Sequence, residues 1–210
     1  MRGKRGRQVV AALLLTRGGT IVPGVNTLAE IPVGAGGFTR AIAVGDRPSG
    51  VAAGEGSVWV IDEGDGTVQR IDPASGSVVA TKSANGTPTG IAAGEGAARI
   101  TTGFGSAAGA GSTLYRFDPA SNDVSKASDI PSGTQAVAAG DGAIWVADEV
   151  NGQVLRIDPK TGTTQPPVNV GPQPTAVAVA ASGEHPVWVT DALDSRAANT
   201  IVPLRPGNVA

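Results

Sequence analysis

The sequence predicts an all-β protein, a β-propeller built of about four four-stranded antiparallel blades of about 40 residues each. The first observation behind this prediction is a repeated phrase, which reads PSGVAAG in its first copy and PTGIAAG in its second. Val51, Ile91, Val137 and Val177 hold the same place in four copies, so the repeats follow one another at steps of 40, 46 and 40 residues. A period near 40 with four short apolar segments is typical of a propeller blade.

The second observation is the turn chemistry between the apolar segments. Short hairpin loops recur at Gly54-Glu55-Gly56, Gly94-Glu95-Gly96 and Gly140-Asp141-Gly142, where glycine supplies positive φ. Longer turns start with Asp-Pro and end on a residue suited to the left-handed region, which is Gly76, Asn122 or Gly162. Because three copies solve one steric problem in the same way, the turns support the repeat independently of the apolar pattern.

The repeats divide the chain into three parts. Residues 1–19 form a basic and apolar leader, interpreted either as a disordered segment or as the remnant of an export or membrane segment. Residues 20–37 resemble a degenerate repeat, and residues 38–210 hold the propeller repeats, with blades at 48–86, 88–131, 133–172 and 174–206. The last blade lacks a fourth strand, which residues 39–44 are placed to supply. We expect a partial or open propeller, whose free blade edges favour self-association.

Composition limits the classes of partner and chemistry. The 16 basic and 18 acidic residues nearly cancel, so we expect no nucleic-acid partner. The absence of cysteine excludes disulfides and thiol catalysis. Any membrane contact would run through the N-terminal leader.

The phrases GVAAGEGSVWV, VLRIDPKTG and GPQPTAVAVA resemble the repeats of YVTN-type (YncE-like) bacterial β-propellers, over about residues 39–206. The resemblance implies the fold and carries no catalytic signature. Gly- and Ala-rich members often follow a membrane segment and a regulatory domain, which favours an extracytoplasmic or membrane-attached location over a cytoplasmic one. The distantly related streptogramin lyases resemble metal-assisted elimination enzymes that depend on several histidines. This sequence has one histidine and begins its blades with Ser49, Thr89, Thr134 and Thr175, which argues against lyase activity.

Residues that recur in several blades are predicted to be architectural. Trp59, Trp145 and Trp188 share one position on the second strand, so we expect all three to be buried between blades. On the third strand an arginine stands two residues before an aspartate, at Arg70–Asp72, Arg116–Asp118 and Arg156–Asp158. These side chains could pair with each other or with the next blade, and a structural ion pair is favoured.

Three aspartates end the second strands and would line one face near the channel. A divalent cation or a polar ligand could sit there, although the favoured interpretation is that these carboxylates cap backbone amides of loops. They are Asp62, Asp148 and Asp191.

Departures from the repeat supply the other candidate residues. Blade two replaces tryptophan by Arg99 and inserts a glycine-rich loop that begins at Phe104, while a long loop of blade four contains Asp194 and Arg196. These four residues join the aspartates as candidates for a binding face. Glu184 and His185 are the weaker candidates for catalysis, because a lone histidine in a turn is more often a solvent-exposed residue.

Two function classes follow. The preferred one is a non-enzymatic propeller that binds a small molecule, a peptide or a polysaccharide without a cofactor, as the extracytoplasmic ligand-sensing part of a larger bacterial protein. The alternative is a metal-dependent lyase- or lactonase-like propeller enzyme with a divalent cation at Asp62, Asp148 and Asp191.

Overall fold

The computed structural model describes residues 24–34, 37–103, 111–180, 187–192 and 200–204, which form β-strands and no helix. In this described part there is accordingly no helix that could cross a membrane. The chain divides into two units, Met1–Ala43 and Val44–Ala210.

The described residues of the first unit form one antiparallel hairpin. It joins β1 (Thr27–Glu30) to β2 (Arg40–Ala43), and Nε of Arg40 lies 3.2 Å from Oε2 of Glu30 at its end. From the sequence, residues 39–44 could supply the fourth strand of blade four. In the structure β2, which lies within this segment, pairs with β1 instead.

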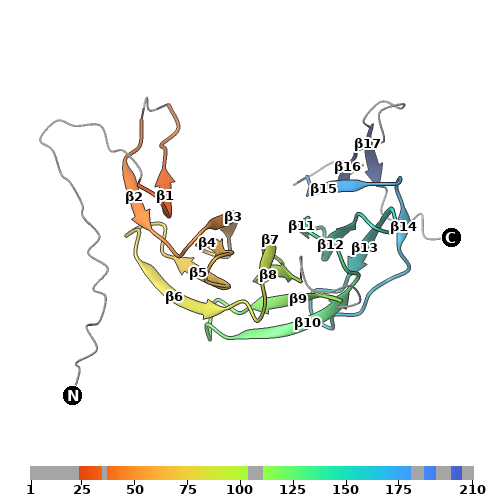
Figure 1. Ribbon diagram of the computed structural model, residues 1–210, viewed down its shortest axis with the longest axis horizontal. Coiled ribbons are helices and arrows are strands. Elements are labelled where there is room, and N and C mark those ends of the chain that lie inside the picture. The colour runs from red at the N-terminus through yellow and green to blue at the C-terminus, as the bar shows by residue number, and fades with distance from the viewer. Residues whose placement is uncertain (1–23, 35–36, 104–110, 181–186, 193–199, 205–210) are drawn as a thin grey trace, which may run out of the picture. The chain divides into compact units, whose positions relative to one another are not determined.

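The second unit holds four antiparallel sheets that match the predicted blades in order (Figure 1). Blade one contains β3 (Pro48–Gly54), β4 (Ser57–Asp62), β5 (Thr67–Ile71) and β6 (Val78–Ser83). Blade two contains β7 (Pro88–Gly94), β8 (Ala97–Thr102), β9 (Ser112–Phe117) and β10 (Val124–Ile130). Blade three contains β11 (Val137–Gly140), β12 (Ala143–Asp148), β13 (Gln153–Ile157) and β14 (Val168–Asn169). Blade four has three described strands, β15 (Pro174–Val179), β16 (Val187–Asp191) and β17 (Thr200–Leu204).

The turns form as the sequence predicts, with one refinement. Gly76, Asn122 and Gly162 adopt positive φ at the ends of the Asp-Pro turns. In the short hairpins both central residues have positive φ, as in type I′ turns, so Glu55 (φ 53°) and Glu95 (φ 54°) adopt a conformation that usually falls to glycine, asparagine or aspartate.

The hydrophobic core consists of three clusters, one at each junction between successive blades. Blades one and two share the cluster that contains Trp59 and Phe117, whose rings meet edge to face at a centroid distance of 4.9 Å. Blades two and three share Leu114 and Val146, and blades three and four share Trp145 and Val189. First strands of successive blades also lie in contact, in the order β3, β7, β11 and β15.

The prediction that all three tryptophans are buried is correct for two of them. Trp59 is 0% exposed and Trp145 is 5% exposed, because the next blade packs against each ring. It is wrong for Trp188, which is 40% exposed. Trp188 stands on the side of β16 that faces away from blade three, and the described residues include no further blade on that side. The propeller is therefore open, with sheets that do not close into a ring.

Candidate functional site

The three aspartates at the ends of the second strands are buried, with exposed fractions of 0% for Asp62 and Asp148 and 3% for Asp191. Asp148 accepts hydrogen bonds from the backbone nitrogen of Asn151 at 3.1 Å and from its Nδ2 at 2.7 Å. Asp191 accepts one from the backbone nitrogen of Gln173 at 3.0 Å. These carboxylates therefore bind amides of the loops around them.

The two carboxylate oxygens of the buried Asp62 have different surroundings. Its Oδ2 accepts a hydrogen bond from the Thr67 hydroxyl at 3.2 Å, while Oδ1 is buried and has no hydrogen-bond partner among the described residues. Burial raises the pKa of the Asp62 carboxyl, and this effect exceeds the opposing one of the Thr67 hydroxyl.

Glycine in the segment before a blade lets the chain pass close to these carboxylates. A Cβ on Gly45 would fall 2.6 Å from Cγ of Asp62, and a Cβ on Gly171 would fall 1.4 Å from Oδ2 of Asp191. Real Cβ atoms do not approach so closely. Asp62 and Asp191 consequently lie against the entry segments of blades one and four. The described residues contain no group of three side chains suited to hold a metal ion.

Arg99 is almost completely buried, with 1% of its surface exposed. Its Nη2 donates a hydrogen bond to the carbonyl oxygen of Pro159 at 2.8 Å, and its Nε has no hydrogen-bond partner in the described chain. Burial, and then the nearby charge of Arg116, lower the pKa of the Arg99 guanidinium to about 10. This buried side chain therefore links blade two to blade three.

The recurrent arginines of the third strands have different partners. Nη1 of Arg116 lies 2.7 Å from Oδ2 of Asp118, as the spacing predicts. Arg70 reaches the next blade instead and donates to the Pro119 carbonyl oxygen, while Nη1 of Arg156 donates to Oε1 of Gln165 at 2.7 Å.

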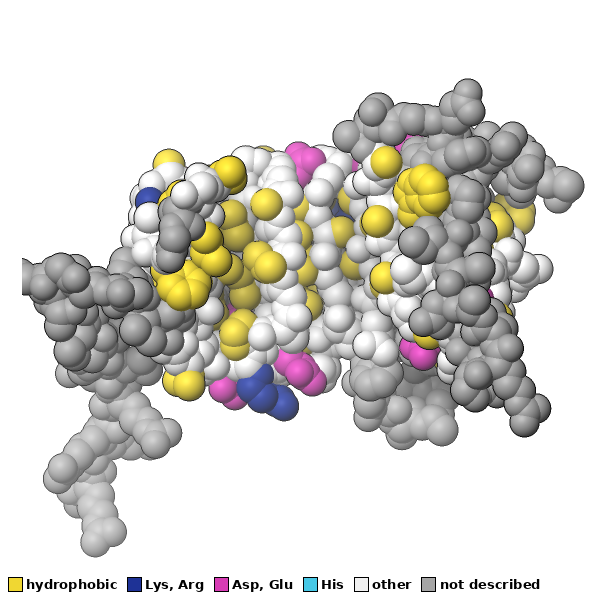
Figure 2. Space-filling model, turned by 90° about the horizontal axis from the view of Figure 1, so that it is seen from above, with side chains coloured by type: hydrophobic (Ala, Val, Ile, Leu, Met, Phe, Trp, Pro, Cys, Tyr) yellow, Lys and Arg dark blue, Asp and Glu magenta, His cyan; other side chains and the backbone are white. Residues whose placement is uncertain are grey.

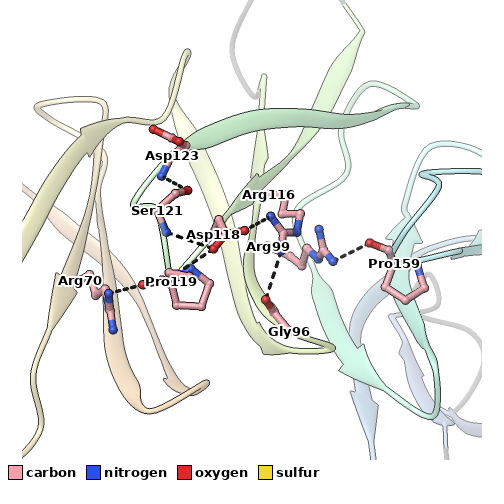
Figure 3. Close-up of polar contacts among 10 residues, drawn as sticks. Arg70, Gly96, Arg99, Arg116, Asp118, Pro119, Ser121, Asp123 and Pro159 are labelled. Atoms are coloured by element: carbon pink, nitrogen blue, oxygen red, sulfur yellow. Dashed lines mark hydrogen bonds and ion pairs between the residues drawn. The ribbon is translucent and has the colours of Figure 1, made fainter.

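Figure 3 shows what these arginines do at the junctions of blade two. Arg70 and Arg99 point in the same direction, each toward the proline carbonyl of the Asp-Pro turn in the next blade. Arg116 turns back to Asp118 and to the Gly96 carbonyl within its own blade. One kind of contact between blades is thus made from β5 in blade one and from β8 in blade two.

Two glutamates outside the set of predicted site residues also join neighbouring blades. Oε1 of Glu55 accepts a hydrogen bond from the Gly96 backbone nitrogen at 3.1 Å, and Oε1 of Glu95 accepts one from that of Gly142 at 3.1 Å. The repetition of Gly-Glu-Gly in blades one and two is the sequence signal for this contact.

A small pocket of about 160 Å³ lies between blades three and four. It is formed where β12 ends and where the first strands of the two blades begin, and its lining residues are Gln135, Ala136, Ala147, Glu149, Pro174 and Thr175. Thr175 is one of the blade-entry residues named in the sequence analysis, and Gln135 directly follows another, Thr134. Glu149 is the one titratable side chain among them, and it is half-buried.

The surface over the first strands is poor in charge. Figure 2 shows hydrophobic and uncharged side chains across the middle of this view, with acidic and basic side chains toward its margins. The remaining candidates, Phe104, Glu184, His185, Asp194 and Arg196, lie outside the described residues.

Known structures with similar folds were found across 74% to 88% of the chain. They include the β-propeller domain of Cps50 (Swd1) from Myceliophteria thermophila, with a TM-score of 0.57, 11% identity, and coverage of 81% of this chain and 60% of that one. BBS1N, crystallised in complex with ARL6DN, has a TM-score of 0.63, 17% identity, and coverage of 88% and 60%. The fold is a β-propeller.

A third similar structure is the hydrazine synthase of Kuenenia stuttgartiensis, with a TM-score of 0.60, 8% identity, and coverage of 74% of this chain and 45% of that one. The chain thus spans about half of these structures' own lengths. At such identities the likeness shows the fold alone. No protein-family model matches the sequence, and no curated protein matches it.

Proposed function

We propose that this chain is a non-enzymatic interaction module that binds a peptide segment of a partner in the pocket between blades three and four. The observation that carries the proposal is this pocket, which is lined by the first residues of two blades and by Glu149.

The size of the pocket decides which partner is favoured. Pockets that hold small molecules usually measure roughly 300–1,000 Å³. A volume of about 160 Å³ accommodates one side chain of a peptide rather than a whole ligand. Glu149 complements a lysine or arginine, and Gln135 and Thr175 supply hydrogen-bonding groups beside it. Among the similar propellers, the association of BBS1N with ARL6DN gives a precedent for a binding role.

Peptide binding measured by fluorescence anisotropy tests this proposal. Labelled peptides that carry lysine or arginine in an otherwise neutral sequence should bind, and matched peptides with glutamate in that place should not. Glu149→Lys should weaken binding at least about tenfold, since a favourable charge contact becomes repulsive.

The chain offers a matched control. Glu63 follows Asp62 as Glu149 follows Asp148, but Glu63 is exposed and does not line the pocket. Glu63→Lys should leave binding unchanged. Equal loss in both variants, or no selective binding of basic peptides, would contradict the proposal.

We also propose a finer placement, as the extracytoplasmic ligand-sensing part of a larger YVTN-type bacterial protein. The repeated phrases and the basic residues before Val9 support it. Fusion of alkaline phosphatase to the C-terminus tests the location, because this reporter is active only after export. An inactive reporter on a stably produced fusion would count against it.

A further inference from the structure

The second strand of blade four differs from its equivalents in how it is covered. In β8 and β12 every residue is buried, so both faces of these strands are packed. In β16 burial alternates along the strand: Val187, Val189 and Asp191 are buried, whereas Trp188 and Thr190 are exposed. One face of blade four therefore packs on blade three, and the other is open to solvent.

The internal junctions show what normally covers this face. Trp59 of blade one packs on Phe117 of blade two, and Trp145 of blade three packs with Val187 and Val189 of blade four. Trp188 holds the same position in blade four as these two tryptophans do in their blades. We call the surface formed by Trp188, Thr190 and Ala178 the trailing face.

Blade one carries the complementary surface. In the first strands, Ile91 lies opposite Ile100 and Val177 lies opposite Val189, and each packs on the cluster shared with the preceding blade. Val51 has the same place in blade one but is 59% exposed, although Val60 opposite it is 2% exposed. We call the surface around Val51 the leading face.

We propose that the trailing face of one chain docks on the leading face of a second copy of this chain. The contact would repeat, between two molecules, the junction that the chain forms three times within itself. Two copies together would provide eight blades, which is within the usual range of four to eight for a closed propeller. This interface is heterologous, because a different surface of each copy takes part. It lies apart from the peptide-binding pocket between blades three and four.

Sedimentation velocity of the 210-residue chain at increasing concentration provides the first test. The wild-type chain should form a species of twice the 20.7 kDa monomer mass. Trp188→Asp and Val51→Asp should each remain monomeric, because a carboxylate would be buried in the contact. Val150→Asp is the matched control, since Val150 is 68% exposed and lies on neither face, and it should associate as the wild type does.

Mixing the two defective variants distinguishes this contact from any symmetric one. The Trp188→Asp chain keeps its leading face and the Val51→Asp chain keeps its trailing face, so the mixture should form a one-to-one complex through a single junction. A wild-type chain that stays monomeric would overturn the proposal. Association of the Val51→Asp chain by itself would also overturn it, because that chain could pair only through like faces. Circular dichroism shows that each variant is folded before it is measured.

Discussion

Nη2 of Arg99 in blade two donates a hydrogen bond to the carbonyl oxygen of Pro159 in blade three, at a distance of 2.8 Å. Arg99 occupies the place that tryptophan holds in the other blades, and it replaces an apolar contact by a polar one across the same junction. In blade one the corresponding bond to a proline carbonyl comes from Arg70 on the third strand, while Trp59 fills the second-strand position. Cζ of Arg70 lies over the Trp59 ring, 5.8 Å from the ring centroid. The arginine that bonds to the Asp-Pro turn of the next blade can thus come from the second strand or from the third strand.

Arg99→Ala should destabilise the fold by about 2–4 kcal/mol, because it leaves a cavity and removes the partner of a carbonyl oxygen. Urea unfolding followed by circular dichroism measures this change. Arg116→Ala serves as the control, since Arg116 is partly exposed and pairs with Asp118 at the surface, where ion pairs contribute little. A loss for Arg99→Ala no larger than for Arg116→Ala would mean that Arg99 does not hold the junction.

Truncation of the tryptophans should divide them into two classes. Trp59→Ala and Trp145→Ala should each cost about 3–5 kcal/mol, as large aromatic truncations in cores do. Trp188→Ala should cost below about 1 kcal/mol in the monomer, within the range of surface substitutions. Thermal or urea unfolding of the three variants on the Val51→Asp background, which we expect to keep the chain monomeric, makes the comparison. Three equal losses would contradict the open trailing face.

The close approach of glycine to the buried aspartates gives a prediction of non-additivity. Gly45→Ala should be destabilising, because its Cβ would fall 2.6 Å from Cγ of Asp62. In an Asp62→Ala background the same change should cost less, because the atoms that it meets are gone. A double-mutant cycle measures the difference. Additive losses would show that the chain can move away from the carboxylate at no cost.

The raised pKa of Asp62 predicts how stability varies with pH. The folded chain holds the Asp62 proton to a higher pH than the unfolded chain does, so this group's contribution is fully present below the unfolded pKa and is lost as pH rises through the folded pKa. As pH rises above about 4, the ordinary pKa of an aspartate, the wild type should therefore lose stability relative to Asp62→Asn. The free energies of unfolding of both proteins in urea, measured at several pH values, give the test.

Asp118 provides the opposite case. The hydrogen bond from Arg116, followed by those from the amides of Ala120 and Ser121, lowers the pKa of its carboxyl. Its contribution is present above the unfolded pKa and is lost as pH falls through the folded one. The stability of Asp118→Asn relative to the wild type should accordingly rise on acidification, whereas that of Asp62→Asn should fall. Parallel pH curves for both variants would contradict the two assignments.

The repeat pattern predicted most of the fold because propeller blades depend on turns and apolar strands that are visible in the sequence. The Asp-Pro turns end on a left-handed residue at Gly76, Asn122 and Gly162, and the four sheets follow the predicted order. The exposure of Trp188 could not be predicted from its own repeat, because it depends on what the next blade covers. A sequence motif describes one blade, while burial at this position belongs to a pair of blades.

The candidate site was less predictable for a related reason. The sequence marked Asp62, Asp148 and Asp191 as residues that share a strand position, but their hydrogen bonds go to local backbone and to loop residues such as Asn151 and Gln173. Glu149 stands beside one of them and lines the pocket, although Glu63 holds the same position in blade one and does not. Their position in the repeat is the same, so the repeat alone could not assign the pocket to Glu149.

Solvent access to the three indole rings tests the central structural claim, that the propeller is open beyond blade four. The measurement is made on ¹⁵N-labelled Val51→Asp chain, so that no second copy covers the trailing face, and a soluble paramagnetic agent is added while the indole N–H signals are recorded. The open propeller predicts strong broadening for Trp188 and little for Trp59 and Trp145, in keeping with their exposed fractions of 40%, 0% and 5%. Equal protection of all three rings would show that blade four is covered within a single chain, as in a closed ring, and would contradict the account.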